Sequence, residues 1–378
     1  MVQIVTVNVS QQVASTPSQL QRTGCFVTQG GTTTATYTCT LLTSLADLSS
    51  IISTGSAANE LQAMANTFFA QGTSTAVYVL ELGAGIPSVG VTELTTYIQS
   101  LAGTGVGTSE YKPRFYSYLI PKEWDTEATF KPLTSEYANP TSQLYFYVTT
   151  TTATYSGWEL LGNKSVFAVL QSQSAPTTEF DAAAFFHVAL SYAPSASNLV
   201  SPMEWTYLYG VTPFSELTHT QQTTFYNAGL NWIGTGAEGG ISNKVIVGGQ
   251  FMDVNVDDAL GGNPFNYWYA VDWLSINGEQ ALAAAVINGS NNPTNPLYYN
   301  QSGINTLQGT LQAVVNRGIA FGMILSPCTV NAIDFTTYVA ENPGDYAIGL
   351  YSGLSCTFVP ARGFNAITVY LTASNIPA

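Results

Sequence analysis

The chain has 378 residues and a formal net charge of −14, and only 8% of its residues are charged, against about 25% in a typical soluble domain. Its length suits two or three domains. The nine Lys and Arg form no basic run, which excludes nucleic-acid binding by clustered cations and disfavours an anionic membrane surface. A surface with few charges does little to keep copies apart and favours self-association. An extracellular protein rich in Thr, Ser and Asn is the alternative.

The chain begins with a predicted strand at residues 2–9 (VQIVTVNV), which is rich in β-branched residues. A polar stretch, residues 10–21, follows as a tether. The beginning has neither the basic segment nor the continuous apolar segment of a secretory signal. No run of 18–20 apolar residues occurs, so we expect no membrane-spanning helix.

A first α/β region is predicted from residue 22 to about 150. Leu61, Met64 and Phe68 recur at helical spacing in a helix predicted at 56–70. The remaining elements predicted here are a strand at 76–82, a helix at 91–101 and a strand at 114–120. Strand–helix–strand order implies parallel pairing in one sheet.

The mixture of predicted strands and helices continues toward the C-terminus. Strands are predicted at 144–150, 165–171, 244–253 and 351–359, and helices at 179–190, 219–232, 267–288 and 303–317, the last two separated by a loop at 289–296. We therefore expect a mixed α/β fold of two to three domains, with mixed sheets flanked by helices. The expected division is an arm and tether at 1–21, a first α/β domain at 22–150, a middle region at 151–215, a C-terminal core domain at 216–360 and a C-terminal strand arm at 361–378.

The last segment, residues 364–373, alternates apolar and polar residues like a strand. Both ends of the chain are thus predicted strands on tethers, whose unpaired N–H and C=O groups need a partner sheet. They either add to the sheet edge of a neighbouring subunit or fold back onto their own chain, and the pattern leaves both outcomes open. The residues expected to form such inter-subunit arms are Val2, Ile4, Val5, Val7, Val9, Phe364, Ile367, Val369 and Leu371.

Motifs for chemistry are few. Residues 234–239 match G-x-G-x-x-G, but they follow a predicted helix, the wrong context for a nucleotide site. Residues 253–264 lack the Gly and Glu that a calcium-binding EF-hand loop needs at its sixth and twelfth positions. The two histidines, His187 and His219, lie on different elements, and no G-x-S-x-G elbow occurs. We expect no enzyme activity and no cofactor.

The four cysteines, Cys25, Cys39, Cys328 and Cys356, form no C-x-x-C pair, so neither zinc nor a redox dithiol is indicated. We interpret them as reduced thiols packed as small apolar groups. Two disulfides remain an alternative.

A series of short segments occurs in a recognisable order. In the C-terminal half they are 227–231 (NAGLN), 247–250 (VGGQ), 269–274 (YAVDWL), 295–304 (NPLYYNQSGI), 341–346 (ENPGDY) and 360–364 (PARGF), and near the N-terminus 45–48 (LADL) and 68–71 (FFAQ). In this order the chain resembles the contractile tail sheath proteins of bacteriophage-type tails, over most of its length.

The resemblance implies a subunit that stacks in rings as a helical tube of many copies around an inner tail tube protein. It further implies baseplate and tail terminator partners, terminal arms that join a neighbour's sheet, and contraction by repacking of the lattice. The expected location is the virion tail, with the host cytoplasm during assembly. The alternatives are another self-assembling surface or tail-tube protein, or a secreted glycan-binding protein or hydrolase.

Overall fold

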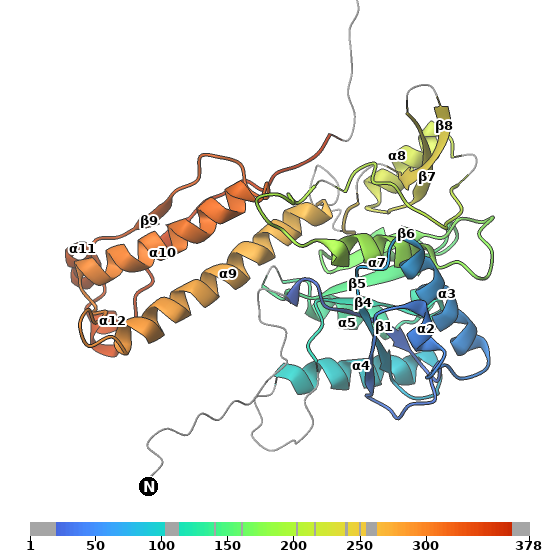
Figure 1. Ribbon diagram of the computed structural model, residues 1–378, viewed down its shortest axis with the longest axis horizontal. Coiled ribbons are helices and arrows are strands. Elements are labelled where there is room, and N and C mark those ends of the chain that lie inside the picture. Colours follow the sequence, from blue (N-terminus) through green and yellow to red (C-terminus); the bar gives the residue numbers. More distant parts are fainter. Residues whose placement is uncertain are drawn as a thin grey trace, which may run out of the picture.

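A six-stranded mixed sheet organises the body of the protein (Figure 1). The computed structural model describes residues 20–102, 113–139, 141–159, 162–201, 203–214, 217–238, 241–248, 251–254 and 263–364. The strands of the sheet are β1 (Gly24–Thr28), β2 (Cys39–Leu42), β3 (Val77–Glu81), β4 (Ser117–Leu119), β5 (Tyr145–Thr150) and β6 (Val166–Leu170).

The strand order is β2-β3-β1-β4-β5-β6. Only the edge strand β2 runs antiparallel to its neighbour; the other pairs are parallel, as strand–helix–strand order predicts. Strands β1, β4, β5 and β6 are buried along their whole length. This agrees with sequences that do not alternate apolar and polar residues, because both faces of a parallel sheet are covered.

Helices cover both faces of the sheet (Figure 1). On one face lie α3 (Ser56–Ala70) and α7 (Asp181–Ser191), and their side chains share a core with the inner ends of two long C-terminal helices. Phe68 of α3 packs edge-on against Phe26 of β1, with ring centroids 5.3 Å apart. The other face is covered by α4 (Pro87–Ala102) and α5 (Phe130–Glu136). The short helical segments around this body are α2 (Leu45–Leu48), η1 (Lys122–Thr126) and α6 (Ser156–Glu159).

A small β unit packs beyond β6. It contains α8 (His219–Asn227) and the antiparallel pair β7 (Ile233–Glu238) and β8 (Ile241–Val247). Asn231 joins it to the body, because its backbone amide donates to the carbonyl of Ala168 in β6 at 2.9 Å. The side-chain amide of Asn231 also donates to the carbonyl of Met252 at 2.8 Å. This fully buried residue therefore connects its own segment to strand β6 and to the segment around Met252.

A long helical hairpin projects from the body (Figure 1). It is formed by α9 (Phe265–Ser290) and α10 (Gln301–Ala320), and it carries β9 (Val330–Ala332), α11 (Phe335–Glu341), α12 (Pro343–Ile348) and β10 (Leu354–Cys356). The inner half of α9 is largely buried up to Gly278, whereas the outer half is not. The hairpin is thus rooted in the body and extends away from it. No helix in the described ranges combines the length and apolar character that a membrane crossing needs.

Most predicted elements are confirmed, and the predicted mixed α/β class is correct. The helix predicted at 219–232 was too long, since α8 ends at Asn227. The chain turns at Gly229, which has φ +71°, and Asn231 then hydrogen-bonds to β6. The G-x-G-x-x-G segment begins inside strand β7 rather than between elements. The expected boundary near residue 150 falls between β5 and β6, which pair with each other; the division into domains stays a prediction.

Candidate assembly surfaces

A two-stranded ribbon runs along the helical hairpin. Strands β9 and β10 pair antiparallel, with Asn331 opposite Ser355 and Val330 opposite Cys356. The pairing continues toward the body, where the amide of Leu325 donates to the carbonyl of Val359 at 2.9 Å. A two-stranded ribbon has two outer edges, and each offers backbone groups to a further strand unless something covers it.

Helix α10 covers the outer edge of β9. The backbone amide of Val330 donates to Gln312 Oε1 at 2.8 Å, and Gln308 Nε2 donates to the Val330 carbonyl at 2.8 Å. Gln312 Nε2 also donates to the carbonyl of Cys328 at 3.1 Å. Two glutamines one helical turn apart thus occupy backbone groups that another strand would use.

The outer edge of β10 differs. Pairs that exchange hydrogen bonds alternate along an antiparallel ladder with pairs that do not. The amide of Ile333 donates to the Gly353 carbonyl, and Val359 accepts from Leu325, so odd-numbered residues of this strand face β9. The backbone groups of Leu354, Cys356 and Phe358 therefore point outward. Within the described ranges, β9 is the one strand that pairs with β10.

Both ends of the described chain are fastened to the first turns of α9. Gln21 Nε2 donates to the Tyr269 carbonyl at 2.9 Å, and Asn266 Nδ2 donates to the Ala361 carbonyl at 2.6 Å. Asn266 and Tyr269 are three residues apart, so both contacts fall within the first two turns of α9. Gln21 and Ala361, near the two ends of the described chain, are therefore both held by the start of α9.

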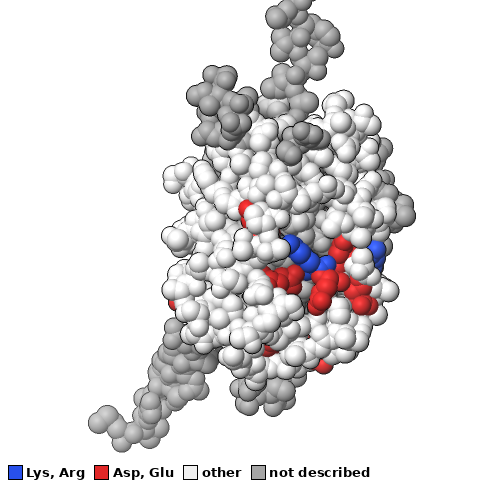
Figure 2. Space-filling model, turned by 90° about the vertical axis from the view of Figure 1, so that its right-hand side faces the viewer, with Lys and Arg blue, Asp and Glu red and all other residues white. Residues whose placement is uncertain are grey.

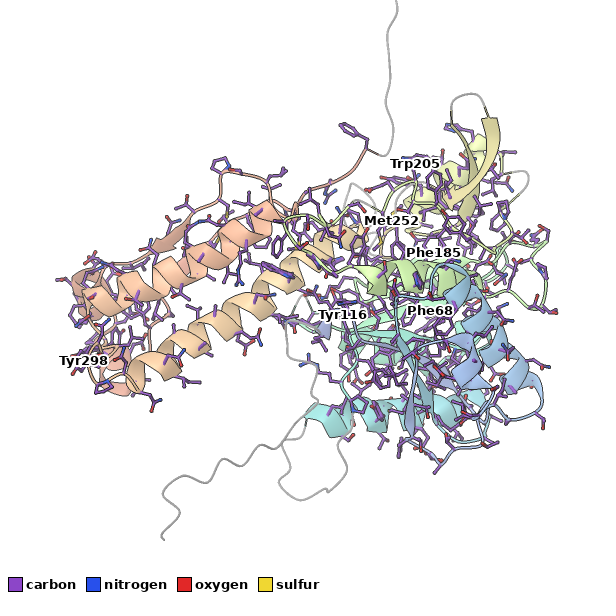
Figure 3. The ribbon with its side chains drawn as sticks, viewed as in Figure 1. Phe68, Tyr116, Phe185, Trp205, Met252 and Tyr298 are labelled. Carbon is purple, nitrogen blue, oxygen red and sulfur yellow. The ribbon has the colours of Figure 1, made fainter. Side chains whose placement is uncertain are left out.

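A hydrogen bond holds the last described residue of the chain, Phe364. Trp205 Nε1 donates to the carbonyl of Phe364 at 3.0 Å, and the side chain of Phe364 is 77% exposed. Figure 3 labels Trp205, which lies on the β7–β8 side of the body. Phe364 is the one predicted arm residue that the structure describes. Val2, Ile4, Val5, Val7, Val9, Ile367, Val369 and Leu371 lie outside the described residues.

A buried polar group joins the hairpin to the sheet. Asp272 of α9 accepts hydrogen bonds from the hydroxyls of Tyr116 and Tyr145, both at 2.7 Å. Burial raises the pKa of Asp272 to about 6, although Lys164 and the two hydroxyls favour its charged form. Lys164 itself is buried between the rings of Tyr145 and Trp268, and burial lowers its pKa. These contacts fix the root of the hairpin to β4 and β5.

The two histidines lie on different helices, His187 on α7 and His219 on α8. His187 is buried in α7, where burial lowers its pKa to about 4 and a hydrogen bond with the Gly72 backbone opposes this in part. His219 is exposed at the start of α8. Across the residues that the structure describes, no group of three or more His, Cys, Asp or Glu side chains is placed to hold a metal ion.

Comparison with known proteins rests on structure, since no protein-family model and no curated protein matches the sequence. The helical sheath of the anti-feeding prophage in its contracted state superposes with a TM-score of 0.61 at 13% identity, covering 99% of this chain and 100% of that one. A chain of the contracted anti-feeding prophage baseplate gives 0.58 at 12% identity, covering 99% and 97%. A sheath tail protein from Listeria innocua gives 0.55 at 9% identity, covering 83% and 91%.

The chain has the fold of a contractile tail sheath protein.

The tip of the hairpin in this sheath fold exposes apolar side chains, including Tyr298, which Figure 3 labels there. Tyr298 is 66% exposed and Ile348 is 76% exposed. Near them in sequence, the rings of Tyr299, Phe335 and Tyr346 pack on one another with centroids 5.2 to 5.9 Å apart. The tip is therefore an ordered apolar surface, of the kind that marks contact with another molecule.

The surface of this sheath fold is poor in charge, as its composition predicts. Figure 2 shows a face on which charged side chains gather in one patch, while most of the described surface around it carries none. One of the few carboxylates is engaged within the chain, because Glu60 Oε1 accepts a hydrogen bond from the backbone amide of Lys122 at 2.8 Å. Large areas are left for contacts without charge repulsion.

The sequence predicted strand arms at the ends of the chain but indicated no surface that could receive them. Nothing in the pattern around 351–359 shows that one edge of the strand is covered and the other open, because the covering glutamines lie on α10. Asp272 lies in the segment YAVDWL, which carried the resemblance, but the sequence assigned no role to the residue itself. A lone acidic residue in an apolar helix segment was the available signal that it is buried and hydrogen-bonded.

Proposed function

We propose that this chain is the subunit of a contractile tail sheath, with a structural role and no enzyme activity. The observation that carries the proposal is the fold match over 99% of the chain and 100% of the anti-feeding prophage sheath chain. The low charge supports it, because subunits that pack densely must bury surface without leaving charges unpaired. The subunits would form a homo-oligomeric tube that surrounds an inner tail tube and meets a baseplate and a tail terminator.

The outer edge of β10 is the proposed acceptor for an arm. Leu354, Cys356 and Phe358 present outward backbone groups, and an added strand gains main-chain hydrogen bonds along this edge. The β9 edge is a poorer acceptor because Gln308 and Gln312 already occupy it. At the body end, Pro360 faces outward without an N–H group, so pairing stops there. The proposed donors are the predicted strands at 2–9 and 364–373.

Contraction in this proposal moves whole subunits. The hairpin is rooted in the body through α9 and the Asp272 hydrogen bonds, and bending it would break both of these bonds. Body and hairpin therefore act as one rigid unit. The change of lattice falls on the tethers of the two arms, which adjoin Gln21 and Ala361, the residues held by α9.

Two deletions test the proposal. Chains lacking residues 1–9 or residues 366–378 are expected to keep the circular dichroism spectrum of the full chain and to remain monomeric in gel filtration. Negative-stain images of the full chain should show tubes that both deletions lack. Tubes of normal length from either deletion would contradict the arm mechanism. A full chain that stays monomeric at high concentration would contradict the sheath role itself.

A point variant tests the acceptor edge. Leu354→Pro removes an outward N–H group from β10 and should reduce tube formation at least tenfold. Leu354→Ala is the matched control, since it shortens the same side chain but keeps the N–H group, and it should still form tubes. Equal loss in both variants would mean that side-chain packing, and not backbone pairing, is responsible.

A further inference from the structure

Two cysteines face each other across the ribbon. Cys328 Sγ and Cys356 Sγ are 3.3 Å apart. Cys356 lies opposite Val330, and Cys328 precedes Val330 by two residues, so the two thiols are diagonal neighbours on one face of the ribbon. A disulfide bond is about 2.05 Å long. The sulfur atoms need to approach by only about 1.2 Å from their present separation.

We propose that Cys328 and Cys356 form a reversible intrachain disulfide that ties the two strands of the ribbon together. Cys356 is the less buried of the two, so it is the thiol that a small-molecule disulfide can reach. Its thiolate attacks one sulfur of that disulfide, giving a mixed disulfide and releasing one small thiol. The Cys328 thiolate then displaces the second small thiol. Two protein thiols are oxidised, and one small-molecule disulfide is reduced to two thiols.

The other two cysteines are a built-in comparison. Cys25 lies on β1 and Cys39 on β2, and β3 runs between these strands. Two strand spacings amount to about 9.5 Å, and a disulfide needs Cα atoms closer than about 7 Å. Cys25 and Cys39 therefore cannot join without taking the sheet apart.

The disulfide would constrain β10, the strand of the ribbon whose outer edge is open. It would close the segment between Cys328 and Cys356, which carries α11 and α12, and it would hold β10 against β9. Burial and the neighbouring Cys328 thiol raise the pKa of Cys356 to about 12. The thiolate is therefore scarce at neutral pH, and the oxidation should be slow there and faster at alkaline pH.

The test uses the purified full chain, equilibrated at pH 8.5 with glutathione disulfide in excess over glutathione, followed by alkylation of the remaining thiols. We expect the mass of the chain to fall by about 2 Da before alkylation. Trypsin releases residues 318–362 as one peptide that holds both Cys328 and Cys356. Cleavage after Glu341 should then leave two halves that separate only after reduction.

Variants separate the proposal from general oxidation. Cys356→Ser and Cys328→Ser should each lose the linked peptide, whereas Cys39→Ser should keep it. The oxidised wild type should unfold about 5 °C higher than the reduced one, a shift absent from Cys356→Ser. The proposal would be overturned if the two halves of the peptide separate without reduction and both cysteines are alkylated. It would also be overturned if the only disulfides found join two different chains. None of these readings requires tubes, so the result stands apart from the proposed sheath role.

Discussion

Tyr116, next to strand β4, donates a hydrogen bond of 2.7 Å to Asp272 of helix α9, across 156 residues of sequence. Together with the equal bond from Tyr145, it fastens the projecting hairpin to the central sheet. The carboxyl group is almost fully buried, and its second oxygen has no hydrogen-bond partner in the described part of the chain. The two hydrogen bonds therefore fix the geometry between hairpin and sheet, while burial of the carboxyl group costs free energy. Substitutions at this contact should change the stability of the protein measurably.

Removing one hydroxyl should weaken the joint. Tyr116→Phe leaves Asp272 with one hydrogen bond fewer and should destabilise the protein by about 1–2 kcal/mol, seen as a lower urea midpoint. Tyr118→Phe is the matched control, because the Tyr118 hydroxyl is equally buried but has no hydrogen-bond partner among the described residues. It should be neutral or slightly stabilising. Equal losses in both variants would argue that the Asp272 bond contributes nothing.

The Asp272 carboxyl should make stability depend on pH. Its ordinary pKa is 3.8 and its pKa in the folded protein is about 6. Between these values the folded protein holds a proton that the unfolded chain has released, so stability falls as pH rises from about 4 to 6 and stays lower above. The loss is on the order of 3 kcal/mol.

Asp272→Asn should remove this part of the slope, since its amide oxygen still accepts from both tyrosines but does not titrate. Urea midpoints of the variant and the wild type, measured from pH 4 to pH 7, give the difference directly. Asp181, whose pKa burial raises to about 7, contributes a similar slope to both proteins and cancels. Parallel curves would show that Asp272 does not titrate in this range.

The turn after α8 depends on one glycine. Gly229 has φ +71°, and a Cβ there would lie 2.5 Å from the Asp253 carbonyl oxygen. Gly229→Ala should destabilise the protein by roughly 2 kcal/mol or more through strain and the clash with backbone. Gly309→Ala is the control, because a Cβ at this helical, exposed position meets nothing within 4 Å, and it should stabilise α10 by up to about 1 kcal/mol. Thermal unfolding midpoints should move in opposite directions.

The glutamine hydrogen bonds that cover the outer edge of β9 can be removed by substitution. Gln312→Leu deletes the acceptor of the Val330 amide, so hydrogen exchange of this amide should be at least tenfold faster, read by mass spectrometry. Gln308→Leu deletes only the donor to the Val330 carbonyl, and the Val330 amide should stay protected. If exchange at Val330 is unchanged in Gln312→Leu, the edge is not held by this side chain.

The sequence by itself determined the class of fold and most of the larger elements, but it indicated neither β1 nor β2 of the central sheet. The helical spacing of Leu61, Met64 and Phe68 and the lack of apolar–polar alternation in the buried strands are local patterns, and local patterns report which face a residue buries. The order of short segments was enough to indicate a sheath fold at identities of 9–13%. Where a local pattern misled, at the end of α8, the cause was a glycine whose conformation is set by the backbone of Asp253 and Val254.

Only the tertiary structure decided which surfaces remain open and which residues meet. Gln312 and Val330, Tyr116 and Asp272, and Cys328 and Cys356 are pairs between different elements, separated by 18, 156 and 28 residues. Each depends on how helices and strands pack, and no periodicity along the chain encodes that distance. The low charge predicted an associating subunit, but which outer edge of the β9–β10 ribbon is covered follows only from the placement of α10.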